Sequence, residues 1–215
     1  MNNNLFQTEY DITQKTKIRK FYENNKVKII LFLLLLTIFI ISFFFYIEVK
    51  KNKKITLTEN YIAAKIYIEN DNKNEAIKSL VKIIHSNDNT YSPLSLFLIL
   101  DANLIDDKEV ISDYFLHILK NCKFDKEIEN LIILKKALHE SSFASEDKLL
   151  ESLRPIINSE SLWKSHALFL LGDYHLDKNK KNQAREFYLQ VLKIKNLNKD
   201  FYERARIQIL LTTND

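Results

Sequence analysis

The chain has 215 residues, which is enough for one ordinary domain and a short additional segment. It contains one glycine and two prolines. Nucleotide-binding loops need several glycines, and tight hairpin turns usually need glycine or Asn-Gly pairs, so both features are nearly excluded. The composition favours an all-α fold in which short polar loops join the helices.

The net charge of +4 is unevenly distributed along the chain. Residues 1–28 carry a net charge of +3, residues 48–54 carry a further +3, and residues 55–215 carry −2. The basic excess therefore lies on both sides of residues 29–47. This arrangement argues against a nucleic-acid-binding surface and for attraction to anionic lipid headgroups.

The N-terminal residues 1–28 are predicted to form a cytoplasmic segment. Residues 1–14 are polar and rich in asparagine, and we expect them to be poorly ordered. Ile18, Phe21 and Tyr22 stand among basic residues. This pattern is consistent with a short interfacial helix or with an ordinary solvated run of charges.

Residues 29–47 form an uninterrupted run without a charge, in which every residue except Thr37, Ser42 and Tyr46 is Ile, Leu or Phe. As a helix this run is about 28 Å long, which matches the hydrocarbon core of a bilayer. We therefore predict a transmembrane helix over 29–47, followed by a basic juxtamembrane linker over 48–56.

Two alternatives to an uncleaved anchor are a cleaved signal peptide and a buried core helix. The apolar run is longer than the core of most signal peptides, and no small-x-small cleavage pattern follows it. Soluble helices are rarely apolar on every face over such a length. Six Lys/Arg precede the span and four Lys follow it. This bias places the N-terminus in the cytoplasm and, in a Gram-negative bacterium, residues 48–215 in the periplasm.

Beyond Lys54, apolar patterns with helical spacing alternate with short polar breaks. Helices are predicted over 57–70, 74–86, 93–105, 108–121, 126–140, 146–157, 162–177, 180–195 and 199–212. Ser92-Pro93, Asp106-Asp107 and Ser145 mark three of the helix starts. Pro155 should end its helix near Arg154 or kink it.

A spacing of twelve positions and then four recurs along the chain and predicts a repeat. It joins Ala64, Ala76 and Leu80, then Leu98, Val110 and Tyr114, and finally Gly172, Ala184 and Tyr188. Ala64 and Leu98 are separated by the period of tetratricopeptide repeats, about 34 residues, and one degenerate copy fits before Gly172. Small residues on both helices of a pair let the helices approach, and the larger residue one turn later fills the groove towards the next pair. The repeat-packing residues are predicted to be Ala64, Ala76, Leu98, Val110, Gly172, Ala184 and Tyr188.

These patterns predict an all-α chain with a single N-terminal transmembrane helix. Residues 57–215 should form a tetratricopeptide-like α-solenoid of about four helix pairs plus a C-terminal helix.

The whole layout resembles the YfgM-like proteins, which are ancillary subunits of the SecYEG translocon. The resemblance is carried by the basic segment Ile18–Tyr22, the single span, Ala63-Ala64, Glu75-Ala76 and the tryptophan-led stretch Leu162–Gly172. It implies a periplasmic tetratricopeptide-like domain in the bacterial inner (plasma) membrane. It also implies the SecYEG translocon and a periplasmic chaperone or prolyl isomerase as protein partners.

Residue types that carry chemistry show no catalytic or metal-binding pattern. No two histidines have i,i+4 spacing, and a Gly-x-Ser-x-Gly elbow is impossible with one glycine. Cys122 is the only cysteine, and we expect a half-buried thiol in a helix. His175 is expected to pack in the repeat, and Trp163 to be either a core residue or a partner-binding anchor. We therefore predict no enzyme, no cofactor, no metal, no small-molecule substrate and no nucleic-acid partner.

Three hypotheses exist for the function of such a chain, and an enzyme of unknown type is the least favoured of them. The first is a membrane-anchored protein–protein interaction scaffold, which the resemblance specifies as a translocon subunit linked to periplasmic chaperones. The second is an envelope assembly or cell-division coordinator that uses the same repeat domain. The sequence indicates binding in both cases but does not identify the partner-binding residues.

Overall fold

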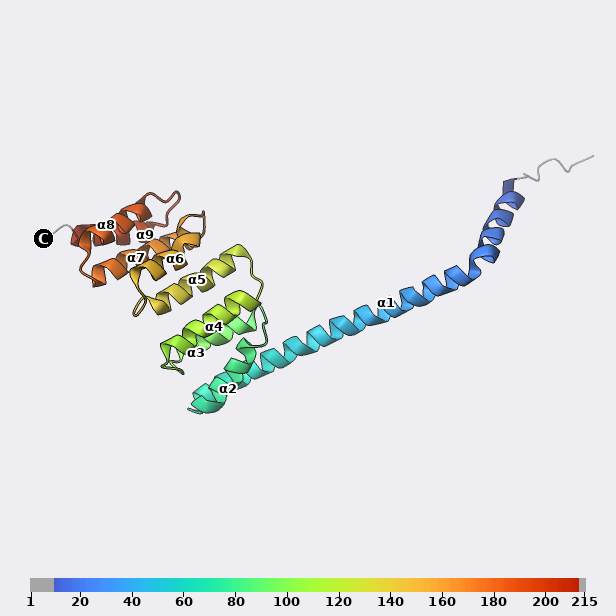
Figure 1. Cartoon of the computed structure of the whole chain (residues 1–215), viewed down its shortest axis with the longest axis horizontal. Helices are drawn as coiled ribbons and strands as arrows, with labels where there is room; N and C mark the ends of the chain where they lie inside the picture. The colour runs from blue at the N-terminus through green and yellow to red at the C-terminus, as the bar shows by residue number, and fades with distance from the viewer. Residues whose placement is uncertain (1–9, 213–215) are drawn as a thin grey trace, which may run out of the picture. The chain divides into compact units, whose positions relative to one another are not determined.

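The computed structural model describes the backbone of residues 10–212 and the side chains of residues 19–212. This part of the chain is all-α, as predicted, with nine helices and no strand (Figure 1). The helices are α1 (Tyr10–Glu69), α2 (Lys73–Ile84), α3 (Tyr91–Asp101), α4 (Lys108–Asn121), α5 (Lys126–Glu140), α6 (Glu146–Ile157), α7 (Lys164–Asp177), α8 (Lys181–Leu192) and α9 (Lys199–Leu211).

Helix α1 is continuous where the sequence indicated several elements. It contains the basic segment Ile18–Tyr22, the predicted span, the linker 48–56 and nearly all of the helix predicted over 57–70. Residues 1–9 of the predicted poorly ordered stretch lie outside the described residues, and residues 10–14 are helical. Lys, Asn and Thr tolerate a helix, and no glycine or proline interrupts this segment. The polar residues after the span therefore do not end the helix.

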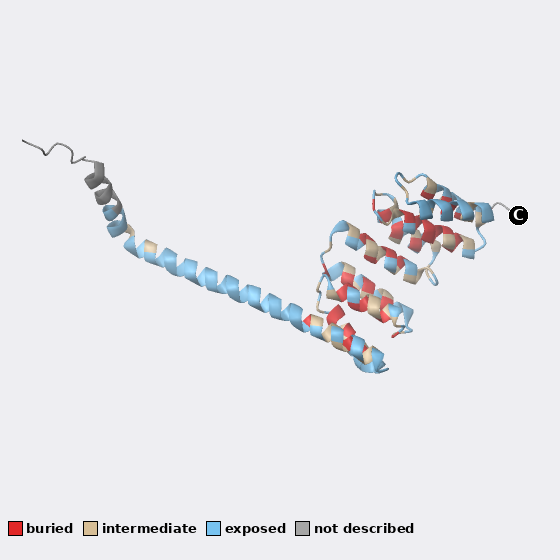
Figure 2. Cartoon of the chain, turned by 180° about the vertical axis from the view of Figure 1, so that it is seen from behind, coloured by how far each residue is buried: buried red, intermediate tan, exposed pale blue. Residues whose placement is uncertain are grey.

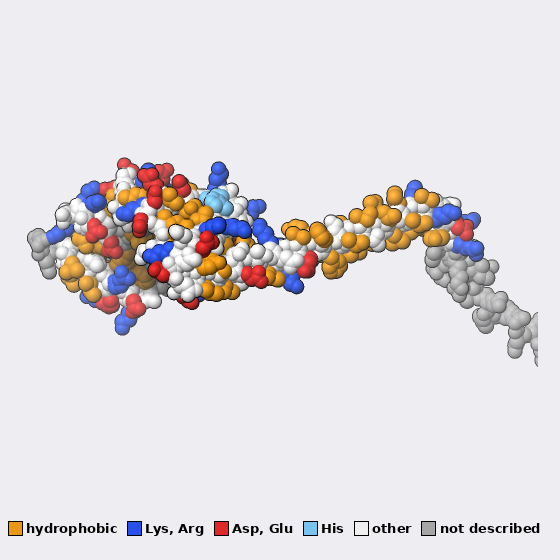
Figure 3. Space-filling model, turned by 90° about the horizontal axis from the view of Figure 1, so that it is seen from below, with side chains coloured by type: hydrophobic (Ala, Val, Ile, Leu, Met, Phe, Trp, Pro, Cys, Tyr) orange, Lys and Arg blue, Asp and Glu red, His pale blue; other side chains and the backbone are white. Residues whose placement is uncertain are grey.

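The chain divides into two compact units after Thr56. In the first unit, α1 is long and apolar enough to cross a membrane. The apolar side chains of its span are exposed, and Figure 3 shows them over the long helical rod, with Lys and Arg at the end nearest the undescribed residues.

The described part of the second unit, residues 57–212, is a stack of helix pairs. Each pair has a first helix (residues 57–69 of α1, then α3, α5 and α7) and a second helix (α2, α4, α6 and α8), and α9 packs on α8. Buried residues lie between neighbouring helices along the stack (Figure 2). Each helix contacts mainly its neighbours in the chain, as in a repeat protein.

The 12-and-4 spacing recurs in every pair with all its members buried. The four sets are Ala64, Ala76 and Leu80; Ile99, Ile111 and Phe115; Ala137, Leu149 and Leu153; and Gly172, Ala184 and Tyr188. In the second pair the buried register is one residue later than predicted, because Leu98, Val110 and Tyr114 are only half-buried. The degenerate copy is the third set, which begins at Ala137, slightly more than one repeat period after Ile99.

Gly172 has a specific role in the fourth pair. A Cβ atom added at this position would lie 2.8 Å from both Cδ1 and Cζ of Tyr188, which is closer than real Cβ contacts. The Tyr188 hydroxyl donates a hydrogen bond of 2.7 Å to Oδ1 of Asp173. The ring therefore occupies the space that the absent side chain leaves, and its polar atom is satisfied.

Asparagine and aspartate replace glycine at the turns that need a left-handed backbone. Asp71, Asn87, Asn103, Asn179 and Asn196 all have a φ between 47° and 58°. After α3, the Asn103 N–H donates to the Leu100 carbonyl and the Leu104 N–H donates to the Ile99 carbonyl, which is the Schellman pattern. A chain with one glycine can thus end its helices normally, because Asn and Asp tolerate this conformation better than other side chains do.

Most helix boundaries follow the local sequence signals. The bounds of α4, α5 and α6 coincide with the predicted ranges, and Oδ1 of Asp107 accepts the N–H groups of Glu109 and Val110 at the start of α4. Helix α6 continues through Pro155 to Ile157, so an end near Arg154 is wrong. Pro155 removes one backbone hydrogen bond in the last turn of α6, and the Asn158 N–H still donates to the Arg154 carbonyl.

Helix α3 begins two residues before the predicted start at Pro93. Oδ1 of Asp88 accepts the N–H groups of Thr90 and Tyr91, and so satisfies the first turn. The Ser92 hydroxyl donates to the Ile83 carbonyl at 3.0 Å and does not cap the helix. Pro93 still fits because its missing N–H lies in the first turn.

Candidate protein-binding groove

An apolar groove lies between two neighbouring first helices, α3 and α5. Its volume is about 620 Å³, which is in the range of ligand-binding clefts. Leu94 is 40% exposed and Ile128 is 45% exposed. Its lining is mostly apolar and comprises Asn89, Thr90, Pro93, Leu94, Phe97, Lys123, Phe124, Asp125, Ile128, Leu131 and Ile132. We call this site the α3–α5 groove.

Side chains one repeat apart fix the loops at the end of the α3–α5 groove. The Lys123 backbone N–H donates to Oδ1 of Asn89 at 3.0 Å. The Cys122 thiol lies 3.9 Å from the Asp88 carbonyl oxygen. These contacts join the loop before α3 to the loop before α5, so the groove is preformed by the stacking of two pairs.

The same kind of bridge links the next pairs of the stack. The Ser161 hydroxyl donates to Glu127 at 2.9 Å, and the Trp163 indole N–H donates to the Glu127 carbonyl at the same distance. Glu146 accepts hydrogen bonds from Lys180 and His175. The Lys180 and His175 hydrogen bonds hold the pKa of the Glu146 carboxyl below its ordinary value.

Charged groups at the α3–α5 groove are few and of both signs. Lys123 and Asp125 lie at the loop end. The Lys135 ammonium lies 5.6 Å from the centre of the Phe97 ring, so its charge interacts with the ring face. The arrangement suits apolar side chains of a partner, with orientation supplied by the charged ends.

The seven predicted repeat-packing residues do not form a binding site. Ala64, Ala76, Gly172, Ala184 and Tyr188 are buried between helices, and Leu98 and Val110 are half-buried. None of the seven lines the α3–α5 groove. Only Leu98 lies on a helix that lines the groove, and the other six lie on helices that do not.

Candidate chemical residues have structural surroundings in the described part of the chain. His175 is buried, with Nδ1 2.7 Å from the Leu171 carbonyl and Nε2 3.1 Å from Glu146. His85 and His117 have ring centres 4.5 Å apart, but no group of three or more His, Cys, Asp or Glu is placed to hold a metal among the residues described.

Two single residues differ in detail from their predictions. Cys122 is buried at the end of α4 and not within the helix, and burial raises the pKa of its thiol. Trp163 is half-buried against the core of the third and fourth pairs, and its indole N–H is used within the fold.

The α3–α5 groove was not found from the sequence. Helix α3 reads Tyr-Ser-Pro-Leu-Ser-Leu-Phe-Leu-Ile-Leu-Asp, which is apolar on nearly every face, so the pattern does not separate the core side from the exposed side. The available signal was an excess of apolar residues over what one core face needs.

Comparison with known proteins identifies the repeat type in one pair. Residues 165–196 match the tetratricopeptide repeat model, and this stretch covers most of α7, all of α8 and part of the following loop. No curated protein and no solved structure matches the chain. The fourth pair is therefore similar to a tetratricopeptide repeat, and the helix pairs stacked before it give the chain the tetratricopeptide-like α-solenoid predicted from its sequence.

Proposed function

We propose that this protein is a membrane-anchored protein–protein interaction scaffold. The α3–α5 groove carries the proposal, because it is an exposed apolar site between stacked helix pairs. Tetratricopeptide repeats support a role in binding proteins. Stacked repeats offer extended surfaces on which a helical or extended segment of a partner can lie.

The proposed anchor is the apolar part of α1. Leu33, Leu34 and Leu35 are exposed like the rest of the run, so no protein surface covers them in the first unit. Full-length protein should stay in the membrane pellet after alkaline carbonate extraction. A variant with Leu34→Lys and Ile38→Lys should move to the supernatant, because each charge at the centre of a span costs about 3 kcal/mol. Wild-type protein in the supernatant would refute the anchor.

The finer role that we propose is an ancillary subunit of the Sec translocon that links it to periplasmic chaperones or a prolyl isomerase. The protein would then lie in the bacterial inner membrane with its N-terminus in the cytoplasm and residues 57–215 in the periplasm. The resemblance to YfgM-like proteins and the excess of Lys and Arg before the span support this role. The alternative is an envelope assembly or cell-division coordinator.

Site-specific photocrosslinking in cells tests both the scaffold function and the translocon role. A photoreactive residue replaces Leu94 or Ile128 in the α3–α5 groove, and the matched control replaces Leu189, which is 39% exposed on a second helix. The groove positions should give discrete protein adducts that the control lacks. Adducts with translocon subunits or chaperones would support the translocon role. Adducts with division or outer-membrane assembly proteins would instead support a role in envelope assembly or cell division. Equal adducts from all three positions would refute the groove as the binding site.

A further inference from the structure

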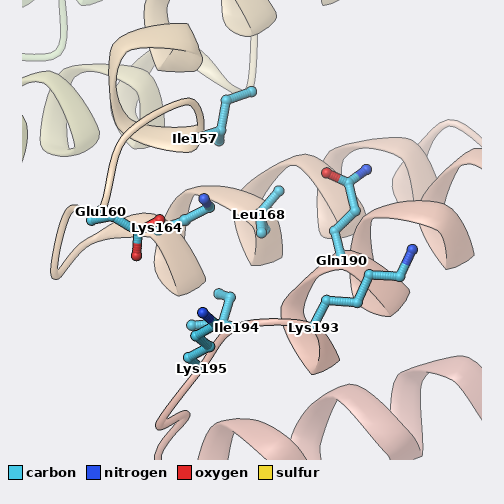
Figure 4. A pocket seen from close by; sticks show the side chains of 8 residues that line it. All are labelled: Ile157, Glu160, Lys164, Leu168, Gln190, Lys193, Ile194 and Lys195. Atoms are coloured by element: carbon cyan, nitrogen blue, oxygen red, sulfur yellow. The ribbon is translucent and has the colours of Figure 1, made fainter.

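A second pocket lies at the junction between the third and fourth helix pairs. Its volume is about 380 Å³, within the range of about 300–1,000 Å³ that small-ligand sites occupy. Figure 4 shows that α6, the loop after it, α7, α8 and the loop before α9 all contribute to its lining. The lining residues are Ile157, Glu160, Lys164, Leu168, Gln190, Lys193, Ile194 and Lys195. We call this site the lysine pocket.

The lysine pocket combines an apolar part with three ammonium groups. Ile157, Leu168 and Ile194 supply aliphatic surface. Within the described residues, none of the lysines at 164, 193 and 195 has a carboxylate within the 4.0 Å of an ion pair. With Glu160, the formal charge of the lining is +2. The pocket therefore presents cations that the fold itself does not neutralise.

The equivalent junction one pair earlier lacks this charge. The third set of packing residues begins at Ala137 and the fourth at Gly172, and this offset relates equivalent positions of the two pairs. At the same offset before the three pocket lysines, the chain holds Glu129, Asn158 and Glu160. The repeat architecture does not require lysine at these places, because the equivalent junction one pair earlier lacks it.

We propose that the lysine pocket binds an acidic segment of a protein partner, with one or more carboxylates between the ammonium groups and an apolar side chain on the aliphatic surface. The inference rests on the proposed function only in that its ligand is a protein. Carboxylates accept charge-assisted hydrogen bonds from lysine. Charge complementarity of this kind sets specificity and association rate.

The remaining polar groups favour a peptide over a phosphate. The Gln190 amide offers both a donor and an acceptor, which match the C=O and N–H of a peptide unit. The Glu160 carboxylate can accept a backbone N–H of a peptide, a donor that inorganic phosphate does not have. Inorganic phosphate also has no apolar group that could be buried against the aliphatic surface.

Isothermal titration of the full-length protein in non-ionic detergent micelles tests the proposal. The probe is the peptide acetyl-Leu-Asp-Glu-Leu-Asp-amide, and its control replaces the acids by Asn and Gln. The double variant Lys193→Gln with Lys195→Gln should weaken binding of the acidic peptide by about tenfold or more. The matched variant Lys82→Gln with Lys148→Gln removes two lysines elsewhere and should leave binding unchanged.

Three outcomes would overturn the proposal. The first is equal binding of the acidic and amide peptides. The second is an equal loss of binding in both lysine variants, which would indicate a nonspecific effect of net charge. The third is displacement of the peptide by inorganic phosphate but not by chloride at equal ionic strength, which would indicate an anion site. Photocrosslinking from the α3–α5 groove separates this failure from a failure of the proposed function, because it does not involve the lysine pocket.

Discussion

The second and fourth helix pairs pack around the same spacing with different residues. In the fourth pair, Gly172 and Ala184 leave room for the ring of Tyr188, and α7 and α8 approach more closely than α3 and α4 do. In the second pair, Ile99 and Ile111 fill that room with aliphatic side chains, and Phe115 follows them. The comparison shows that the same spacing accommodates two sets of packing side chains that differ in their summed volume.

The largest expected effect on stability comes from substitution at the first packing position of the two pairs. Gly172→Leu should lower the free energy of unfolding by about 3 kcal/mol, because the new side chain overlaps the Tyr188 ring. Ile99→Leu at the equivalent position of the second pair keeps the volume and should cost less than about 1.5 kcal/mol. Urea unfolding followed by circular dichroism measures both. Equal costs would mean that the two pairs do not differ in packing.

The next effect concerns the hydroxyl of Tyr188. Tyr188→Phe removes the hydrogen bond to Asp173 and should cost about 1.5–2 kcal/mol, because that bond joins a buried group to a carboxylate. Burial and Asp173 raise the pKa of Tyr188 above its ordinary value. The same substitution in an Asp173→Ala background should cost less, and an unchanged cost in that background would rule out the pair as the cause.

A smaller effect depends on pH at the junction of the third and fourth pairs. Because the pKa of Glu146 is lowered in the folded state, its contribution is present above the ordinary glutamate pKa of about 4.3 and is lost as the pH falls through the lowered value. Glu146→Gln should lower the melting midpoint at pH 7 and flatten its dependence on pH below about 5. Glu151→Gln, on the same helix, is the control. A parallel shift at every pH would exclude this linkage.

The smallest effect is at a left-handed turn. Asn103→Gly should change the free energy of unfolding by no more than about 0.5 kcal/mol, whereas Asn103→Ala should lower it by about 1 kcal/mol because alanine is strained at a φ of 47°. The two melting midpoints measure the difference. Alanine that is tolerated as well as glycine would show that the turn relaxes.

Local signals in the sequence predicted the helices but not their register everywhere. Asp107 and the short polar breaks fixed the bounds of α4 to α6. The packing register of the fourth pair could be predicted because its packing positions hold the only glycine of the chain and a tyrosine. The second pair was placed one residue early, because neighbouring positions such as Leu98 and Ile99 are equally apolar and only burial distinguishes them.

The two proposed binding sites depend on residues from different pairs, which spacing within one pair does not reveal. The α3–α5 groove needs Phe97 from the second pair and Ile128 from the third, and the lysine pocket brings Ile157 of the third pair together with Lys193 at the end of the fourth. In the sequence, none of these residues differs from its neighbours in a helix or loop. They come together only because the helix pairs stack.

The hydrogen bonds that side chains make to residues one repeat away also affect how the domain opens. Since Asn89–Lys123 and Glu127–Ser161 each join only neighbouring pairs, breaking one bridge leaves the others in place. In such a linear array, local unfolding starts most easily at an end. Amide hydrogen exchange should therefore be fast in α9 and slow in α3 and α5. A partner bound in the proposed α3–α5 groove would therefore stay bound while the C-terminal helix unfolds and refolds.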